Sequence, residues 1–309
     1  MLSSEQYEKD AAALRKAMKG WGTDEGPIIN LTANRSNADR QQIAKFYKSS
    51  FGRDVIKDLE DELSGNLRKG IIAMFRTPID YDCSELYGAM KGAGTNEETL
   101  IEIIGTRNNE TLKKIKLRFK ELYQSELEDW LKDETSGEFK KLLVSLVQCN
   151  RSETTVLDEN KLDKDVKDLY EAGEGKWGTD SAVFNRVFAL RSPEELRYIN
   201  KAYCKQMGKD LFKVIDSEFS GDAQKLYKAV LHAVINATDY FAERIRWACK
   251  GWGTNDDVLI RVLVCRDEID LKQIKELYPK KFGKTLYQET KDETSGDYKN
   301  LLMAIAMTD

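Results

Sequence analysis

One short loop pattern occurs four times in this chain, and a glutamate follows each copy at the same distance. The loops read Met18-Lys-Gly-Trp-Gly-Thr23, Met90-Lys-Gly-Ala-Gly-Thr95, Gly173-Glu-Gly-Lys-Trp-Gly-Thr179 and Cys249-Lys-Gly-Trp-Gly-Thr254. The glutamate stands 40 residues after the last glycine of each loop, and the four acids are Glu62, Glu134, Glu218 and Glu293. Ser-Gly follows each acid after one intervening residue. A pattern repeated in one register predicts a repeat protein with one site in each repeat.

The spacing of the loops predicts how the 309 residues divide. The last glycines of successive loops are 72, 84 and 75 residues apart, which indicates four similar units. The longer middle spacing falls in a polar stretch, so we expect a linker there that separates two halves of two repeats each. The predicted parts are a short polar head at 1–10, repeats at 11–76, 82–148, 164–235 and 240–309, and a linker at 149–163.

Apolar residues recur at helical spacing inside each unit, and no alternating strand pattern is present. In the first unit we predict helices at 11–18 and at about 25–34, and a third that Ser36 and Asn37 cap and Gly52 interrupts. Two more follow, one with Val55 and Leu59 on its apolar stripe and one after Ser64-Gly65. The prediction is an all-α protein with five short helices in each of four homologous repeats.

Composition narrows the possible functions. Basic and acidic residues are interleaved along the chain and the net charge is only -4, so direct binding to nucleic acid is not favoured. No apolar run reaches the length of a spanning helix, and the first residues lack the apolar core of a signal peptide. Five cysteines without a C-x-x-C pair argue against a disulfide framework or a zinc site. We therefore expect a cytoplasmic protein that reaches a membrane only as a peripheral component.

The loop and the distant acid together provide hard oxygen ligands. Glycines let the backbone turn sharply, so that carbonyls such as those of Met18, Gly20 and Gly22 can point in one direction. With both carboxylate oxygens of a glutamate they supply about five ligands, whereas Ca²⁺ takes about six to eight. One carboxylate also cancels only half of the charge of the ion. The pattern thus predicts an open calcium site that an anionic lipid phosphate can complete, with several Ca²⁺ bound per chain.

Tryptophan occupies the variable position in three of the four loops, as Trp21, Trp177 and Trp252. An indole at the tip of a polar loop suits the headgroup level of a bilayer, so we predict that these three contact the membrane. The alternative is that they pack against their own repeat. Thr23 and Thr95, with the acids Glu25 and Glu97 that follow them, are candidate ligands of secondary ions; the two acids serve equally well as charges in the first turn of a helix.

A protein-binding scaffold and an enzyme are the alternatives to a membrane-binding module. The loops could be no more than the C-caps and N-caps of successive helices, and the chain would then be a calcium-independent helical scaffold that binds proteins. Such a scaffold has no need of a glutamate at a fixed distance of 40 residues from each loop. Catalysis is not expected, because the chain has one histidine, His232, in an apolar helix and no evident nucleophile triad.

Repeated K-G-x-G-T loops, each followed by an acid 39 residues after the threonine, resemble the annexins over residues 11–309. The resemblance implies a slightly curved disc whose convex face carries calcium loops that meet phosphatidylserine-like lipids. It also implies backbone ligands in each loop together with the distant glutamate. These ligand sets are Met18, Gly20, Gly22 and Glu62; Met90, Gly92, Gly94 and Glu134; Gly173, Lys176, Gly178 and Glu218; and Cys249, Gly251, Gly253 and Glu293.

The resemblance further suggests a central polar channel formed by Asp82, Glu102, Arg107 and Arg261. Ion pairs that bridge neighbouring helices are the preferred interpretation of these four charges, which leaves a calcium-modulated ion channel as the weaker alternative. The expected partner is an anionic phospholipid surface. The chain is expected to be a monomer in solution, with self-association on membranes left open.

Overall fold

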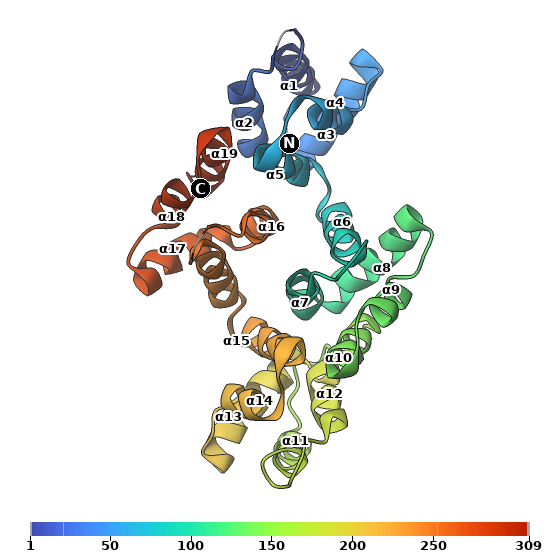
Figure 1. The fold of residues 1–309 in the computed structure, drawn as a ribbon, viewed down its shortest axis with the longest axis vertical. Coiled ribbons are helices and arrows are strands. Elements are labelled where there is room, and N and C mark those ends of the chain that lie inside the picture. The colour runs from blue at the N-terminus through green and yellow to red at the C-terminus, as the bar shows by residue number, and fades with distance from the viewer. Residues whose placement is uncertain (1, 21, 252, 308–309) are drawn as a thin grey trace. The chain divides into compact units, whose positions relative to one another are not determined.

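A computed structural model describes residues 2–20, 22–251 and 253–307, and these residues form helices and connecting segments without any strand. The helices of the described residues, labelled in Figure 1, are α1 (Ser4–Ala17), α2 (Glu25–Ala33), α3 (Asn37–Phe51), α4 (Val55–Glu62), α5 (Gly65–Phe75), α6 (Pro78–Met90), α7 (Glu97–Thr106), α8 (Asn109–Tyr123), α9 (Leu127–Glu134), α10 (Gly137–Val147), α11 (Glu159–Ala172), α12 (Ser181–Leu190), α13 (Pro193–Met207), α14 (Leu211–Glu218), α15 (Gly221–Cys249), α16 (Asp256–Arg266), α17 (Leu271–Phe282), α18 (Leu286–Glu293) and α19 (Gly296–Met307).

The prediction of five helices per repeat is confirmed once α15 is divided. Within this helix Asn236 has φ -158° and ψ 94°, which lie outside the helical region and separate two helical segments. The first segment closes the third repeat and the second opens the fourth. Each repeat therefore has five helices, and the all-α fold class is correct.

The helix boundaries in the first repeat follow from the local sequence. Ser36 caps α3, because its hydroxyl accepts a hydrogen bond from the amide of Asp39 at 3.1 Å. Gly52 ends the same helix in the left-handed conformation, with φ 66°. Gly65 begins α5 with φ 58° directly after the cap residue Ser64. The predicted apolar stripes point inward, and Ile43, Leu59 and Ile71 are fully buried.

Two predicted segments contain more helix than expected. Helix α1 begins at Ser4, inside the expected polar head, because Tyr7 and Asp10 are buried there and bind Asp39 and Arg35 respectively. Helix α11 begins at Glu159, inside the segment 149–163 assigned to the linker, and Asp158 caps it by accepting from the amide of Lys161. The remaining boundaries of the repeats stay a prediction.

The chain forms two compact units, and their composition corrects one expectation. One unit consists of residues 1–81 and 241–309, and the other of residues 82–240. The first repeat is therefore joined with the fourth and the second with the third, so the linker does not separate sequential halves.

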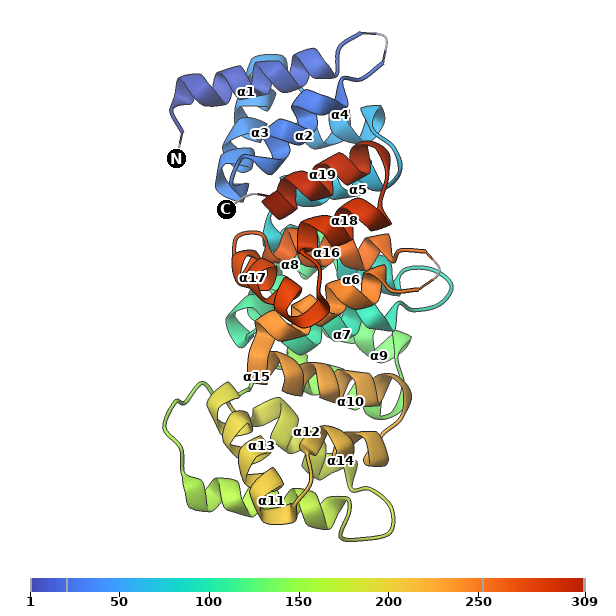
Figure 2. The same cartoon turned by 90° about the vertical axis from the view of Figure 1, so that its left-hand side faces the viewer.

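The packing inside each unit gives the physical reason for this pairing. In the first unit α19 packs against α2 and α5, as Figure 2 shows, and α16 packs against α5. Ala73, Tyr81 and Ile260 form a buried cluster at the α5 and α16 contact. In the second unit α10 packs against α7 of its own repeat and against α12 of the next. The apolar faces of the two terminal repeats thus cover each other.

Candidate calcium sites

All four loops are closed in the same way. In each loop the amide of the residue after the threonine donates to the carbonyl of an alanine at the end of the preceding helix. The distances are 3.0 Å for Asp24 to Ala17, 2.8 Å for Asn96 to Ala89, 2.7 Å for Asp180 to Ala172 and 2.8 Å for Asn255 to Ala248. This shared closure fixes where each loop begins and ends. It places the loop threonine at the start of the next helix.

The loop threonine contacts the distant glutamate in every repeat. The hydroxyl lies 2.9 Å from Oε2 of the acid for Thr23 and Glu62, 3.4 Å for Thr95 and Glu134, and 2.6 Å for Thr179 and Glu218. In the fourth repeat Thr254 donates to the backbone carbonyl of Glu293 at 3.0 Å. The glutamate found 40 residues after each loop therefore contacts that loop in the folded protein. The sequence predicts Thr23 and Thr95 only as secondary ligands; Thr179 and Thr254 stand at the matching positions of the other two loops and make the same kind of contact.

The first residue of each loop anchors it in the core. Met18, Met90 and Cys249 are buried, at 4%, 0% and 3% exposure, so only their backbone is available to a ligand. Burial raises the pKa of the Cys249 thiol to about 12, so this thiol stays protonated at neutral pH. The glycines that follow take backbone conformations closed to other residues, with φ values of 133° at Gly20 and 84° at Gly22. The same holds for Gly92, Gly94, Gly178, Gly251 and Gly253.

The third loop is built differently from the other three. Its Gly173 has φ -124° and its carbonyl accepts a hydrogen bond from the amide of Lys176 at 3.1 Å. The side chain of Glu174, which the sequence analysis did not single out, accepts from the hydroxyl of Tyr203 at 2.9 Å and also pairs with Lys209. These contacts tie the loop to α13 and to the residues after it.

Trp177 is fully exposed at the tip of the third loop, with a relative accessibility of 105%. The alternative that this indole packs against its own repeat is therefore wrong. Trp21 and Trp252, the other two predicted membrane contacts, lie outside the described residues.

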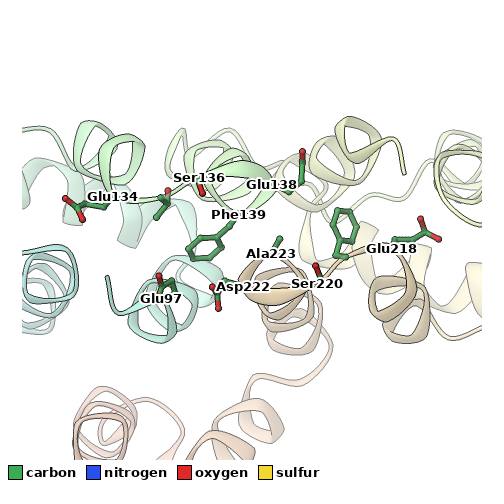
Figure 3. A pocket seen from close by; sticks show the side chains of 11 residues that line it. Glu97, Glu134, Ser136, Glu138, Phe139, Glu218, Ser220, Asp222 and Ala223 are labelled. Carbon is green, nitrogen blue, oxygen red and sulfur yellow. The ribbon is translucent and has the colours of Figure 1, made fainter. Parts of the chain in front are cut away.

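An acidic cleft of about 420 Å³ lies between the second and third sites of the 82–240 unit. Figure 3 shows Glu134 and Glu218 toward opposite ends of the cleft, with Phe139 and Ala223 between them. Five of its lining residues are acids, namely Glu97, Glu134, Glu138, Glu218 and Asp222, and none is basic. Such a cleft attracts cations, and both sites lie within its region of negative potential.

The remaining predicted residues have separate positions. Glu25 and Glu97 are the first residues of α2 and α7, where a negative charge also favours the helix dipole. Asp82 and Arg107 form a bidentate ion pair, with both N–O distances 2.8 Å, that joins α6 to the end of α7. Glu102 and Arg261 are buried, at 0% and 1% exposure. The Asp82–Arg107 pair supports the interpretation of these charges as structural ion pairs.

The donor set of each site fits a hard cation. Among the described residues no three His, Cys, Asp or Glu side chains gather closely enough to hold a metal, so a cation at these loops would take most of its ligands from backbone carbonyls. A carboxylate oxygen that accepts from threonine keeps a second lone pair, and both oxygens remain able to bind an ion. A set of oxygen ligands that includes one carboxylate suits Ca²⁺ better than it suits softer metals. The fold and these loops define an all-helical, four-repeat protein with an oxygen-rich loop site in each repeat.

Comparison with known proteins gives the family. A model of the family described as Annexin matches residues 9–74, 81–146, 164–230 and 240–305. The chain belongs to the annexin family, which is known for calcium-dependent phospholipid binding and whose members are generally not enzymes.

Three known proteins illustrate the similarity. The chain is 44% identical to human Annexin A7 over 96% of its own length and 61% of that protein, and 43% identical to human Annexin A13 over 96% and 94% of the two chains. A structure of calcium-bound annexin (Sm)1 superposes with a TM-score of 0.85 at 34% identity, covering 99% and 92% of the two chains. The chain thus spans about three-fifths of the length of Annexin A7.

None of the helices in the described residues has the length and apolar character needed to cross a bilayer.

Proposed function

We propose that this protein binds anionic phospholipid membranes when calcium is present, through the four loop sites. The observation that carries the proposal is the contact between loop threonine and distant glutamate, which recurs in all four repeats. A glycine turn between two helices explains the loop itself, but it gives no reason for the same distant glutamate to meet the loop in each repeat, through its carboxylate in three of them. The relation to calcium-bound annexin (Sm)1 supports the choice of cation.

Each glutamate and the carbonyls of its loop would hold the ion. These sets are Met18, Gly20, Gly22 and Glu62; Met90, Gly92, Gly94 and Glu134; Gly173, Lys176, Gly178 and Glu218; and Cys249, Gly251, Gly253 and Glu293. In the first three repeats the threonine hydroxyl orients the carboxylate, and the buried first residue holds the loop in place. Calcium bound there supplies a positive charge that a lipid phosphate can share. Thr23, Thr95, Glu25 and Glu97 are proposed to support secondary ions.

The exposed indole of Trp177 supports a membrane as the partner. A fully exposed tryptophan is costly in water and favourable at the headgroup level of a bilayer. The four weak sites also act together on one chain, so membrane binding should rise steeply with calcium concentration. We further propose that the protein is a peripheral scaffold in the cytoplasm that moves to membranes when calcium rises.

Cosedimentation with vesicles tests the proposal. Vesicles of phosphatidylserine and phosphatidylcholine are titrated with calcium, and pure phosphatidylcholine vesicles serve as the control. We expect binding only to the anionic vesicles, and chelator should reverse it. Equal binding with and without calcium, or none at millimolar calcium, would rule the proposal out and favour a protein scaffold.

A further inference from the structure

A second kind of site lies within the 82–240 unit, at a small cavity of about 170 Å³. It is lined by residues from the end of α7, the start of α8, the segment after α10, the start of α13 and the middle of α15. Three of the lining residues are arginines, Arg107, Arg151 and Arg197, and none is acidic. Two of these arginines, Arg107 and Arg197, pair with acids outside the lining, so the positive charge of the cavity rests on Arg151, in contrast to the acidic cleft beside the loops.

Arg151 gives this cavity a charge without a counterion. Its guanidinium donates to the carbonyls of Phe188 and Arg191 at 2.6 and 2.8 Å, and no acidic side chain among the described residues pairs with it. The two carbonyls belong to the end of α12, where the helix dipole offers only a partial negative charge. Burial lowers the pKa of Arg151 to about 10, and the group remains protonated at neutral pH.

Arginines in comparable settings, Arg40 among them, have acidic partners. Arg40, which is 2% exposed, also donates to backbone carbonyls, and Glu268 lies 3.6 Å from it; burial lowers the pKa of Arg40, and the nearby charges of Asp267 and Glu268 oppose this. In the cavity itself Arg107 pairs with Asp82, and Arg197 pairs with Glu194 at 2.9 Å. Among the described residues no acid pairs with Arg151, whose side chain is partly buried. A positive charge in such a place is costly unless something compensates for it.

Two helices also begin at the cavity and add positive potential. The first residues of α8 and α13, which have 15 residues each, line it through Asn109 and Pro193. The volume is several times the roughly 30 Å³ share of one water molecule, which leaves room for an anion of about five heavy atoms. Arginine forks match the oxygen geometry of phosphate groups better than that of a spherical anion.

We propose that this cavity binds a phosphate oxyanion, either free phosphate or the phosphate of a small monoester, with Arg151 as the principal charge and Arg197 at its side. The site is independent of calcium and of the loop sites. Because residue 151 belongs to the segment that connects the second and third repeats, an anion bound there would stabilise the connection between them.

Thermal unfolding in chelator tests this proposal without any contribution from the calcium loops. Inorganic phosphate, and separately glycerophosphate, replaces chloride at constant ionic strength. We expect the unfolding temperature to rise and then saturate, as for a ligand that binds only the folded state. A response to both probes assigns phosphate monoesters as ligands, whereas a response to inorganic phosphate alone assigns the free anion.

Two variants and a control decide whether the effect belongs to the cavity. Arg151→Gln should lose the saturable rise, and Arg197→Gln, which changes a half-exposed residue and should fold, should need roughly tenfold more phosphate, equivalent to about 1.4 kcal/mol. Arg118→Gln changes an arginine on α8 that pairs with Glu121 and does not line the cavity, so it should behave like the parent. No saturable rise in the parent protein, or an unchanged response in Arg197→Gln, would overturn the assignment.

Discussion

The carboxylate of Glu218 lies directly against the backbone of Gly173. A Cβ atom added to Gly173 would stand 2.9 Å from Cδ and 3.1 Å from Cγ of Glu218, closer than such contacts occur in proteins. Two residues of one proposed calcium site, 45 positions apart in the chain, are thus packed together as well as being joined through Thr179. The side chain of Glu218 therefore leaves little room for a Cβ atom at residue 173.

We expect Gly173→Ala to displace Glu218 and weaken the third site while the fold survives. A loss of about 1 kcal/mol in ion binding raises the calcium concentration that this site needs roughly fivefold. Calcium titration of vesicle binding measures the change. Gly88→Ala is the matched control, since Gly88 lies in α6 with open space around its Cβ position, and a gain of about 0.5–1 kcal/mol in stability is expected there. An unchanged calcium requirement in Gly173→Ala would remove Glu218 from the site.

Replacing Glu62, Glu134, Glu218 and Glu293 together with Gln should abolish calcium-dependent vesicle binding. The amide keeps the shape of the side chain but removes the only formal charge that each site offers the ion. Helicity measured by circular dichroism should not change, because all four side chains are at least partly exposed. The control changes four surface acids, Glu5, Glu110, Glu121 and Glu126, and matches the net charge. Calcium-dependent binding that persists in the first variant would defeat the site assignment.

Trp177→Ala should weaken binding to anionic vesicles at saturating calcium by roughly tenfold, which corresponds to about 1.4 kcal/mol of lost interfacial contact. The indole is fully exposed, so its removal should leave the unfolding temperature unchanged. Trp247→Ala is a matched control, because Trp247 is also exposed, at 47%, but lies in α15 against Arg244 and not in a loop. If both variants bind equally well, Trp177 does not contact the membrane.

The acid stability of the protein should depend on Asp58. This buried carboxylate accepts hydrogen bonds from Arg53 at 2.6–2.9 Å and from the hydroxyl of Tyr47 at 2.6 Å, and the bonds from Arg53 lower its pKa. Because the folded pKa lies below the unfolded value of about 3.9, the stabilisation is present above roughly pH 4 and is lost as the pH falls through the folded value.

Asp58→Asn should therefore cost about 1–3 kcal/mol at pH 7, the usual contribution of hydrogen bonds to a charged group. The loss of stability on acidification should also become shallower. Urea unfolding at several pH values measures both effects, with Asp61→Asn as an exposed neighbour on the same helix. A variant as acid-sensitive as the parent would show that other carboxylates control the acid transition.

Local signals in the sequence were sufficient for most of the helix boundaries predicted in the first repeat. Ser36, Gly52 and Ser64-Gly65 act on the few residues next to them through caps and left-handed turns, so their effect does not depend on the rest of the fold. The start of α1 was missed for the opposite reason. Its first turns are fixed by Tyr7 and Asp10, whose partners Asp39 and Arg35 are more than twenty residues away.

The sequence by itself determined the repeat, the five helices in each copy and the acid that belongs to each loop, because these follow from periodicity and from a fixed offset. Only the tertiary structure decided that the first repeat pairs with the fourth, since this depends on which apolar faces remain uncovered. It also brought the threonine hydroxyls onto the glutamates and left Arg151 without an acid. Such contacts form between segments that are far apart in the chain, so the sequence near either residue does not indicate how close the two side chains lie in the folded protein.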